Sequence, residues 1–417
     1  MRKIFFLMAF VLASAVTYAG GYRVGVQGQR ALAMGHTGVA VVNSAELGFF
    51  NPAGLVYLEN KLTISAGASV IFSDVAWQNQ ETGEIARTDN PVGTPFYFNA
   101  SYKLKDWLAL GLSVYTPYGS TVMWEDDWAG SHLVNNIELQ AIYIQPLVSV
   151  QVADFLSLGG GPIFVTGAVN FNRNLTRTLK DEEGNRSNVT IDASGVNAFG
   201  WSASAMFVAT EDIKIGVNYR SEIMMDAEDG EADFQNIPNS PAVPFKDTTF
   251  DATLPLPAEL TAGISYQFDE KWLFAFDYNM VFWGVYESLD VDFGDPNIPD
   301  SKNPRNYKDA STWRFGAQYT ATEKLVLRAG YYYDESPVQE GYFAPETPRN
   351  DSMGFTAGLS LDVTSRLAID ASFAYIRFDE VDASYDHYID ENGQNVPFGG
   401  TYKSVAFIPG LGVTYKL

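Results

Sequence analysis

The side chains that enzymes most often use for catalysis are scarce in this sequence. It contains three histidines, His36, His132 and His387, and no cysteine. Thiol catalysis and thiolate metal sites both need cysteine, so the sequence excludes them. A Ser–His pair in a strand wall would need a histidine on a strand, and all three lie in stretches that we expect to be non-strand. No HExxH, P-loop or nucleophile-elbow motif is present. We therefore expect no enzyme activity, no metal and no cofactor.

Basic side chains at alternating strand positions suggest a different chemistry, the binding of a carboxylate. Four of them share the parity of the side chains that we expect to point inward: Lys214, Arg220, Arg314 and Arg328. A buried carboxylate needs a cation or hydrogen-bond donors, because an unpaired buried charge is costly. The same four cations have an ordinary alternative, which is pairing with acids such as Asp277 and Asp370 or with backbone carbonyls. Both interpretations remain open.

Residues 117–134 hold many apolar side chains for a stretch between strands. The most prominent are Tyr118, Met123, Trp124, Trp128 and Leu133. A loop with this much apolar area must pack on itself or bind something apolar. We expect these five side chains to form a capture site for an apolar ligand.

The chain is strongly acidic, with a formal net charge of −23. We expect no nucleic-acid partner, because such a charge repels a phosphate backbone. Most of the acid lies between expected strands, as in residues 379–391, where solvated loops are the ordinary interpretation.

Residues 1–19 predict a secretory signal peptide. Arg2 and Lys3 precede an apolar core over residues 4–16, and Thr17-Tyr18-Ala19 is a small-x-Ala cleavage site. No later stretch is apolar over about 18 residues, so we expect no transmembrane helix.

The remainder of the chain, residues 60–417, alternates large apolar and mixed side chains with the period of a strand. Fourteen strands are expected, near residues 60–72, 94–103, 107–116, 137–152, 155–170, 195–209, 212–226, 257–268, 271–288, 309–321, 324–334, 352–363, 366–379 and 401–417. Short and long connections alternate strictly between them. Short periplasmic turns and long extracellular loops are typical of outer-membrane barrels. The pattern predicts an all-β protein, a 14-stranded antiparallel transmembrane β-barrel.

The segment before the strands, residues 20–59, follows neither strand nor helix periodicity and is rich in glycine. Near its end, Phe50-Asn51-Pro52-Ala53 contains a turn signal, because proline fixes its own φ and restricts the residue before it. This head, its Asn-Pro-Ala motif and the strands that follow resemble the FadL family of outer-membrane transporters for long-chain fatty acids and aromatic hydrocarbons. The resemblance covers essentially the whole chain.

The resemblance implies that residues 20–59 are a hatch that plugs the barrel of residues 60–417 in the bacterial outer membrane. It also implies capture of a long-chain fatty acid or another apolar molecule at the outer loops, transfer to an interior site against the hatch, and lateral release through the wall. Outer-membrane lipid is the expected surrounding partner, and a monomer is expected. Uptake of aromatic hydrocarbons, or a surface binding protein that uses the barrel as an anchor, are the alternatives.

Two strands are candidates for the lateral exit. Gly160 and Pro162 in the fifth strand would weaken its ladder, because proline removes a hydrogen-bond donor and glycine allows a bulge. Gly111 lies in the third strand, where the family's wall opening is found. The residues favour the fifth strand and the resemblance favours the third; we give the resemblance more weight.

Overall fold

The computed structural model describes residues 21–417. The expected signal peptide, residues 1–19, lies outside the described residues. No helix within residues 21–417 is long and apolar enough to cross a membrane.

Fourteen antiparallel strands form a closed wall, as the sequence predicts. In order around the ring they are β1 (Leu62–Ser69), β4 (Phe96–Lys105), β5 (Leu108–Met123), β6 (Asn136–Ala153), β7 (Leu156–Asn174), β8 (Asn188–Val208), β9 (Ile213–Arg220), β12 (Glu259–Gln267), β13 (Trp272–Val281), β15 (Ala310–Thr320), β16 (Leu325–Asp334), β17 (Ser352–Asp362), β18 (Leu367–Phe378) and β20 (Phe398–Lys416). The ring closes between the first and last strands, where Ile64 lies opposite Tyr415.

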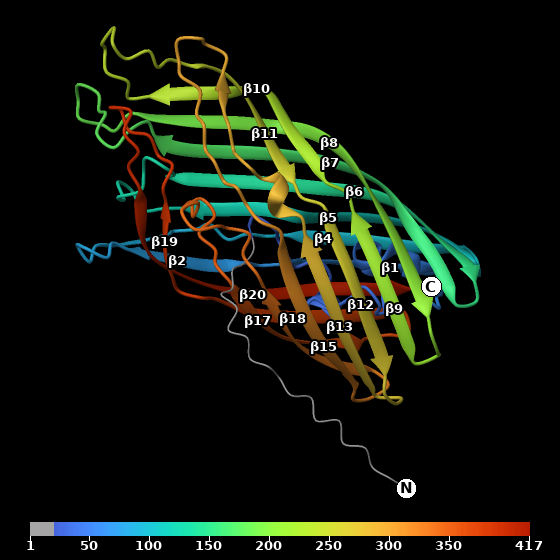
Figure 1. Ribbon diagram of the computed structural model, residues 1–417. Coiled ribbons are helices and arrows are strands. Elements are labelled where there is room, and N and C mark those ends of the chain that lie inside the picture. The colour runs from blue at the N-terminus through green and yellow to red at the C-terminus, as the bar shows by residue number, and fades with distance from the viewer. Residues whose placement is uncertain (1–20) are drawn as a thin grey trace.

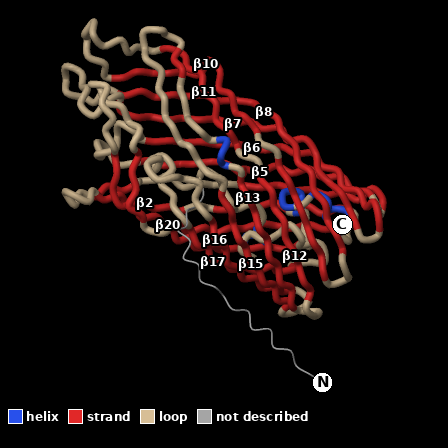
Figure 2. Tube along the Cα trace, viewed as in Figure 1, coloured by secondary structure: helices blue, strands red, loops and turns tan. Residues whose placement is uncertain are grey.

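The remaining strands extend this wall at one end of the barrel. They are β2 (Phe72–Gln78), β3 (Ile85–Arg87), β10 (Ile223–Gln235), β11 (Thr248–Leu256), β14 (Asp292–Phe293) and β19 (Val381–Tyr385). Strand β10 follows β9 after a two-residue break, and β11 precedes β12 in the same way. Figures 1 and 2 show the long loops gathered at this end, whereas tight turns and the C-terminus lie at the opposite end.

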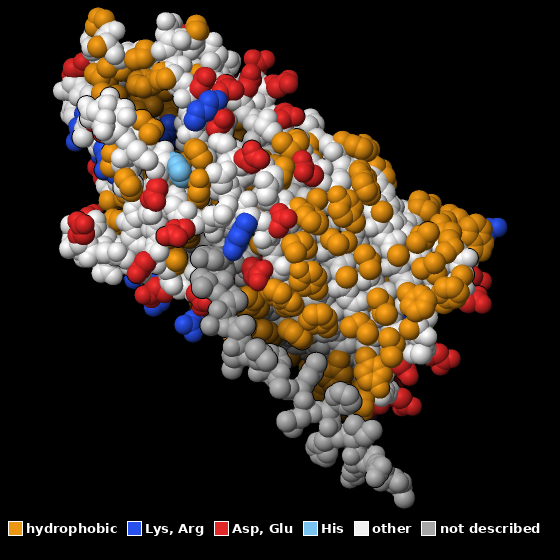
Figure 3. Space-filling model, viewed as in Figure 1, with side chains coloured by type: hydrophobic (Ala, Val, Ile, Leu, Met, Phe, Trp, Pro, Cys, Tyr) orange, Lys and Arg blue, Asp and Glu red, His pale blue; other side chains and the backbone are white. Residues whose placement is uncertain are grey.

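The faces of the wall are inverted relative to a soluble β-sandwich. On β13 the side chains of Phe274 and Trp272 point outward and are 43% and 38% exposed, while Asp277 and Asn279 point inward and are fully buried. Figure 3 shows apolar side chains covering the wall toward the tight turns and charged side chains concentrated toward the loops. An outward apolar band over a polar interior is the arrangement of a barrel in a membrane.

Strand β5 is longer than expected. We predicted that it ends near residue 116 and that a loop begins at Pro117, but pairing with β6 continues as far as Met123 opposite Asn136. Pro117 lies at an irregularity in the register between Tyr115 and Tyr118. Proline is tolerated at such a bulge because no ladder donor is required there, so it does not end the strand.

Residues 21–58 lie inside the ring and contain three short helices. These are α1 (Gln29–Leu32), α2 (Leu47–Phe50) and the 3₁₀ helix η1 (Pro52–Tyr57); a further 3₁₀ helix, η2 (Trp283–Val285), lies in a loop. The segment binds strands on several sides of the barrel. Arg30 forms an ion pair of 2.9 Å with Asp370 on β18, and the Gly38 N–H donates to Asp277 on β13 at 2.7 Å.

Candidate functional site

Asn51 forms hydrogen bonds both within the interior segment and with the wall. Its side-chain amide donates to the carbonyls of Val39, at 2.7 Å, and Ala205 on β8, at 3.1 Å. Its side-chain oxygen accepts from the Ala53 N–H at 3.1 Å and so caps η1. The turn expected from Asn51-Pro52-Ala53 therefore starts a short helix, in which Pro52 occupies the first turn.

Serines on the wall complete this anchor. The Ala53 carbonyl accepts hydrogen bonds from Ser149 and Ser157, at 2.9 and 2.7 Å, and its N–H lies 2.9 Å from the Ser204 hydroxyl. Gly159 makes the approach possible, because a Cβ there would lie 2.4 Å from the Ala53 nitrogen. The glycines of the fifth strand thus permit contact between backbones inside the barrel.

The expected exit residues lie in paired strands. Gly111 pairs with Ser101 on one side and Leu147 on the other, and Gly160 pairs with Val148 and Ala203. Residues 161–163 of β7 have no ladder partners on β6. Pro162 is one of these residues, and it still pairs with Trp201 on β8. A Cβ on Gly161 would be 2.0 Å from the Pro146 carbonyl oxygen, so the two backbones remain in contact. A role for Gly111, Gly160 or Pro162 in exit stays a prediction.

The four expected carboxylate ligands are separated in the structure. Lys214 lies near a tight turn, and Arg328 donates to Gln318 at 2.9 Å and to Ser360 at 2.6 Å. Arg220 and Arg314 are both buried and line one small cavity between the interior segment and the wall.

The two arginines that share this cavity differ in their partners. Arg220 lies 3.5 Å from Glu259, which also lies 3.5 Å from Arg23 of the interior segment. Arg314 has a 3.4 Å hydrogen bond to Asn279 and, among the described residues, no carboxylate within 4.0 Å. Of the four expected side chains, Arg314 is therefore the buried wall cation most available to a bound anion.

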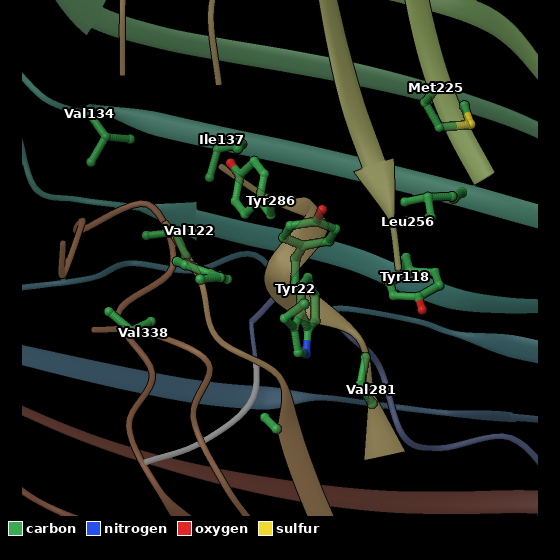
Figure 4. Close-up of a cluster of buried hydrophobic side chains, with 14 of the residues drawn as sticks. Tyr22, Tyr118, Val122, Val134, Ile137, Met225, Leu256, Val281, Tyr286 and Val338 are labelled. Carbon is green, nitrogen blue, oxygen red and sulfur yellow. The ribbon is translucent and has the colours of Figure 1, made fainter. Parts of the chain in front are cut away.

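A second, apolar cavity lies under the outer loops. It has a volume of about 120 Å³, and its walls include Ile137, Val169, Val196, Met225, Leu254 and Leu289. Figure 4 shows Tyr22 near Tyr286 and Tyr118, with Met225 nearby. The centroids of the Tyr22 and Tyr286 rings are 5.5 Å apart. We call this space the apolar cavity. Its lining suits a hydrocarbon.

Two arginines reach the apolar cavity, and one of them is already neutralised. Arg305 forms a buried ion pair with Glu346. Arg173, near the outer end of β7, donates to the His132 carbonyl at 3.2 Å and to Ser301 at 3.1 Å. No carboxylate among residues 21–417 lies within 4.0 Å of Arg173. The cavity therefore has an apolar wall and one cation without an ion-pair partner.

Arg173 belongs to a cluster that also faces the solvent. Arg177 donates to the His132 ring nitrogen at 3.4 Å, and the Nε of Arg186 is buried without a hydrogen-bond partner in the described structure. Burial, together with the charges of Arg177 and Arg173, lowers the pKa of His132 to about 3. His132, Arg177 and Arg186 line a wide polar vestibule at the loop end. We call Arg173, Arg177 and Arg186 the arginine cluster.

The sequence carries a signal for this cluster that strand parity alone did not reveal. Arg173, Arg177 and Arg186 fall within fourteen residues that also contain Lys180, in a chain with a formal net charge of −23. We expected the fifth strand to end at residue 170, whereas β7 continues to Asn174 and carries Arg173 to the cavity.

The expected capture residues do not form one surface. The indoles of Trp124 and Trp128 stack with centroids 4.1 Å apart, and both are buried. Tyr118 is buried and donates to Glu259 at 3.0 Å, Met123 is 42% exposed, and Leu133 lines the apolar cavity. The loop packs on itself, one of the two outcomes that its composition allowed. Ligand capture there stays a prediction.

An antiparallel ring of strands with an outward apolar band defines an outer-membrane barrel, and the interior cavity suits an apolar cargo. The chain belongs to the family described as outer membrane protein transport protein (OMPP1/FadL/TodX), which matches residues 10–417. It is an outer-membrane transporter of hydrophobic compounds and not an enzyme.

Named relatives and solved structures are similar to this chain over most of its length. Outer membrane protein P1 of Haemophilus influenzae is 25% identical over 88% of this chain and 86% of its own length. A long-chain fatty acid transport protein of Escherichia coli is 22% identical, covering 95% of this chain and 96% of its own. The fold is similar to a Pseudomonas aeruginosa FadL homologue, with a TM-score of 0.82, 17% identity and coverage of 95% and 100%. It is also similar to the Pseudomonas putida toluene transporter TodX, with a TM-score of 0.71, 18% identity and coverage of 96% and 99%.

Proposed function

We propose that this protein takes up long-chain fatty acids and that the apolar cavity binds the part of the acyl chain next to the carboxylate. The observation that carries the proposal is Arg173, a cation that lines an apolar cavity and has no carboxylate partner among the described residues. A fatty acid supplies both missing parts, since its chain fills apolar space and its carboxylate pairs with a guanidinium.

The route begins at the arginine cluster. Arg177 and Arg186 attract the carboxylate from the polar vestibule, and Arg173 holds it while the chain enters the apolar cavity. The neutral His132 ring adds no charge to this path, because its pKa lies near 3. From there the acid moves inward to the small cavity that Arg220 and Arg314 share.

Residues 20–59 act as the hatch in this proposal. Their hydrogen bonds to Ser149, Asp277 and Asp370 hold them across the interior, so free diffusion of solutes is blocked. Release requires a shift of this segment, followed by lateral movement of the cargo through the wall into outer-membrane lipid. The protein acts as a monomer, since a single ring contains every part of the route.

A second cargo class is favoured by a separate feature, the aromatic wall of the apolar cavity. Tyr22 and Tyr286 meet edge to face at one end, and Phe171, Phe250 and Phe293 line another part. Aromatic hydrocarbons pack well against such rings. These compounds need no cation, so their affinity would not depend on Arg173.

The test is a binding measurement on purified protein with ligands matched in chain length. Calorimetry with oleate and with oleyl alcohol separates the carboxylate from the chain. We expect oleate to bind more tightly by about tenfold, because a charge-assisted hydrogen bond is worth about 1.5–3 kcal/mol. Equal affinity would remove the carboxylate from the proposal. Binding of neither would remove the fatty acid, and tight toluene binding in that case would favour aromatic hydrocarbons. Binding of no apolar compound would favour a barrel-anchored surface protein.

A further inference from the structure

The barrel wall contains a seam where neighbouring strands do not pair. Strand β8 pairs with β9 as far as Ser202 opposite Arg220, and with β10 only from Asp192 opposite Glu231 outward. A contact of Trp201 with Ser221 ends the first ladder, with the Ser221 N–H 2.9 Å from the Trp201 carbonyl. Between these ladders, residues 193–200 and 222–230 share no ladder pair in the described structure.

Local backbone features explain why the two strands do not pair there. Gly195 on β8 has a φ of +68°, and Asp229 on β10 has a φ of +53°. The register shifts near both residues, between Gly167 and Ala168 on β7 and between Ala227 and Gly230 on β10. Such irregularities bend and twist a strand away from its neighbour. Residues on both strands, β8 and β10, therefore account for the missing ladder pairs.

The outward side chains place the seam at the outer boundary of the membrane. Phe199 and Met224, at its inner end, are 61% and 41% exposed and belong to the apolar band. Asn197, Asp226 and Glu228, farther toward the loops, are exposed and polar. Backbone groups without ladder partners are tolerated at this level, because headgroups and water reach them, whereas they are not tolerated at the bilayer centre.

The inner side of the seam is a wall of the apolar cavity. Val196, Met225 and Ala227 line that cavity. The terminal methyl group of Met225 would lie 2.7 Å from a Cβ built on Gly167, so this side chain reaches across β8 to β7. Side chains alone, without ladder hydrogen bonds, separate the cavity from the membrane here. Methionine is flexible and adapts its shape easily.

We propose that the seam is a side portal through which uncharged apolar compounds dissolved in the outer leaflet reach the apolar cavity. The inference rests on the proposed function of that cavity. The rim of the portal selects for uncharged cargo, because Asp192, Asp226 and Glu228 are exposed around it and repel a carboxylate. Fatty acids arrive through the vestibule and the arginine cluster, whereas hydrocarbons enter from the side.

The chain contains no cysteine, so the portal is open to a clean cross-linking test. Phe199→Cys with Met224→Cys introduces thiols on outward side chains across the seam. Ala205→Cys with Val217→Cys is the matched control, because these residues are partners in the intact ladder of β8 and β9. Each pair is linked in whole cells with a short, reducible bifunctional thiol reagent, and uptake of radiolabelled hexadecane and oleate is measured before and after reduction.

Linking the seam is expected to lower hexadecane uptake by about tenfold, and oleate uptake by less than about twofold, because a closed wall offers a lipid-borne compound no gap. Reduction should restore uptake, and linking the control pair should change neither compound. An unchanged hexadecane uptake, or an equal loss of both compounds, would overturn the portal. Absence of oleate uptake in the unlinked protein would instead refute the proposed function, and the portal with it.

Discussion

Three basic side chains of the wall, Arg220, Arg314 and Arg328, point into the barrel and are 4%, 6% and 6% exposed. Strand parity predicted this direction. Parity says nothing about which acid lies across the lumen. Arg220 meets Glu259, which is 39 positions away in the sequence, and Arg314 meets no carboxylate among residues 21–417. Such pairings depend on barrel closure and on the interior segment, which a local pattern does not encode.

Arg173→Gln tests the proposed carboxylate ligand. We expect the affinity for oleate to fall by about tenfold or more, because the variant loses a charge-assisted hydrogen bond worth about 1.5–3 kcal/mol. The affinity for oleyl alcohol should not change, and calorimetry on the two ligands measures both. Lys214→Gln is the control, since Lys214 lies near a tight turn far from the cavity. A parallel loss for acid and alcohol would show that Arg173 only supports the shape of the cavity.

His132 predicts a pH dependence in the loops. Its pKa is lowered from 6.5 to about 3 by burial and by neighbouring arginines. The group therefore stabilises the folded loops above pH 6.5, and this contribution is lost as the pH falls toward 3. Limited proteolysis of the loops should accelerate over this interval, and less steeply in His132→Gln than in the wild type. Identical pH profiles in both proteins would mean that His132 is not the titrating group.

Strands and loops were predicted well in number and order and less well in extent. The alternation of short and long connections is a property of the whole barrel, so it survives errors at individual strand ends. Two of the missed strand ends lie on the loop side. Strand β5 continues past Pro117 to Met123, and β7 continues past residue 170 to Asn174. In both cases pairing with the neighbouring strand extends the element beyond the point where the local sequence pattern ends.

Loss of the stacked pair Trp124 and Trp128 should change both the order of the outer loop and its binding of apolar ligand. Trp124→Ala with Trp128→Ala removes two stacked, buried indoles, and burial of each large side chain contributes about 3–5 kcal/mol in a packed core. We expect the loop to become sensitive to protease and the capture of apolar ligand to weaken, while the barrel keeps its resistance to SDS. Met123→Ala is the control, because Met123 is 42% exposed. A loosened loop with unchanged ligand affinity would place capture elsewhere.

The molecule as a whole combines a wall that the sequence predicts with an interior that it only suggests. The wall follows from the strand period of residues 60–417 together with the alternation of short and long connections, which is typical of a barrel in a membrane. The interior segment has no such periodicity, because its residues bind different strands. Gly35 forms a hydrogen bond with Thr356, Gly38 with Asp277, and Arg30 with Asp370. Its glycines and its Asn-Pro-Ala motif indicated a compact insert but not these contacts.

Deletion of residues 20–59 tests whether this segment blocks the barrel. The wall closes through its own ladders, so the shortened chain should still fold, and its lumen should conduct small ions in planar bilayers. The intact protein should show little conductance, because the segment is buried across the lumen. Equal conductance of the two proteins would contradict a hatch.

The central claim is that the protein carries long-chain fatty acids across the outer membrane through this cavity. The most direct measurement is uptake of radiolabelled oleate by cells that lack other routes for it and that express either the wild type or Arg173→Gln at equal surface levels. We predict rapid saturable uptake with the wild type and a concentration dependence shifted to higher oleate by about tenfold in the variant, in line with the loss of one charge-assisted contact. Uptake no faster than in cells without the protein would contradict the account.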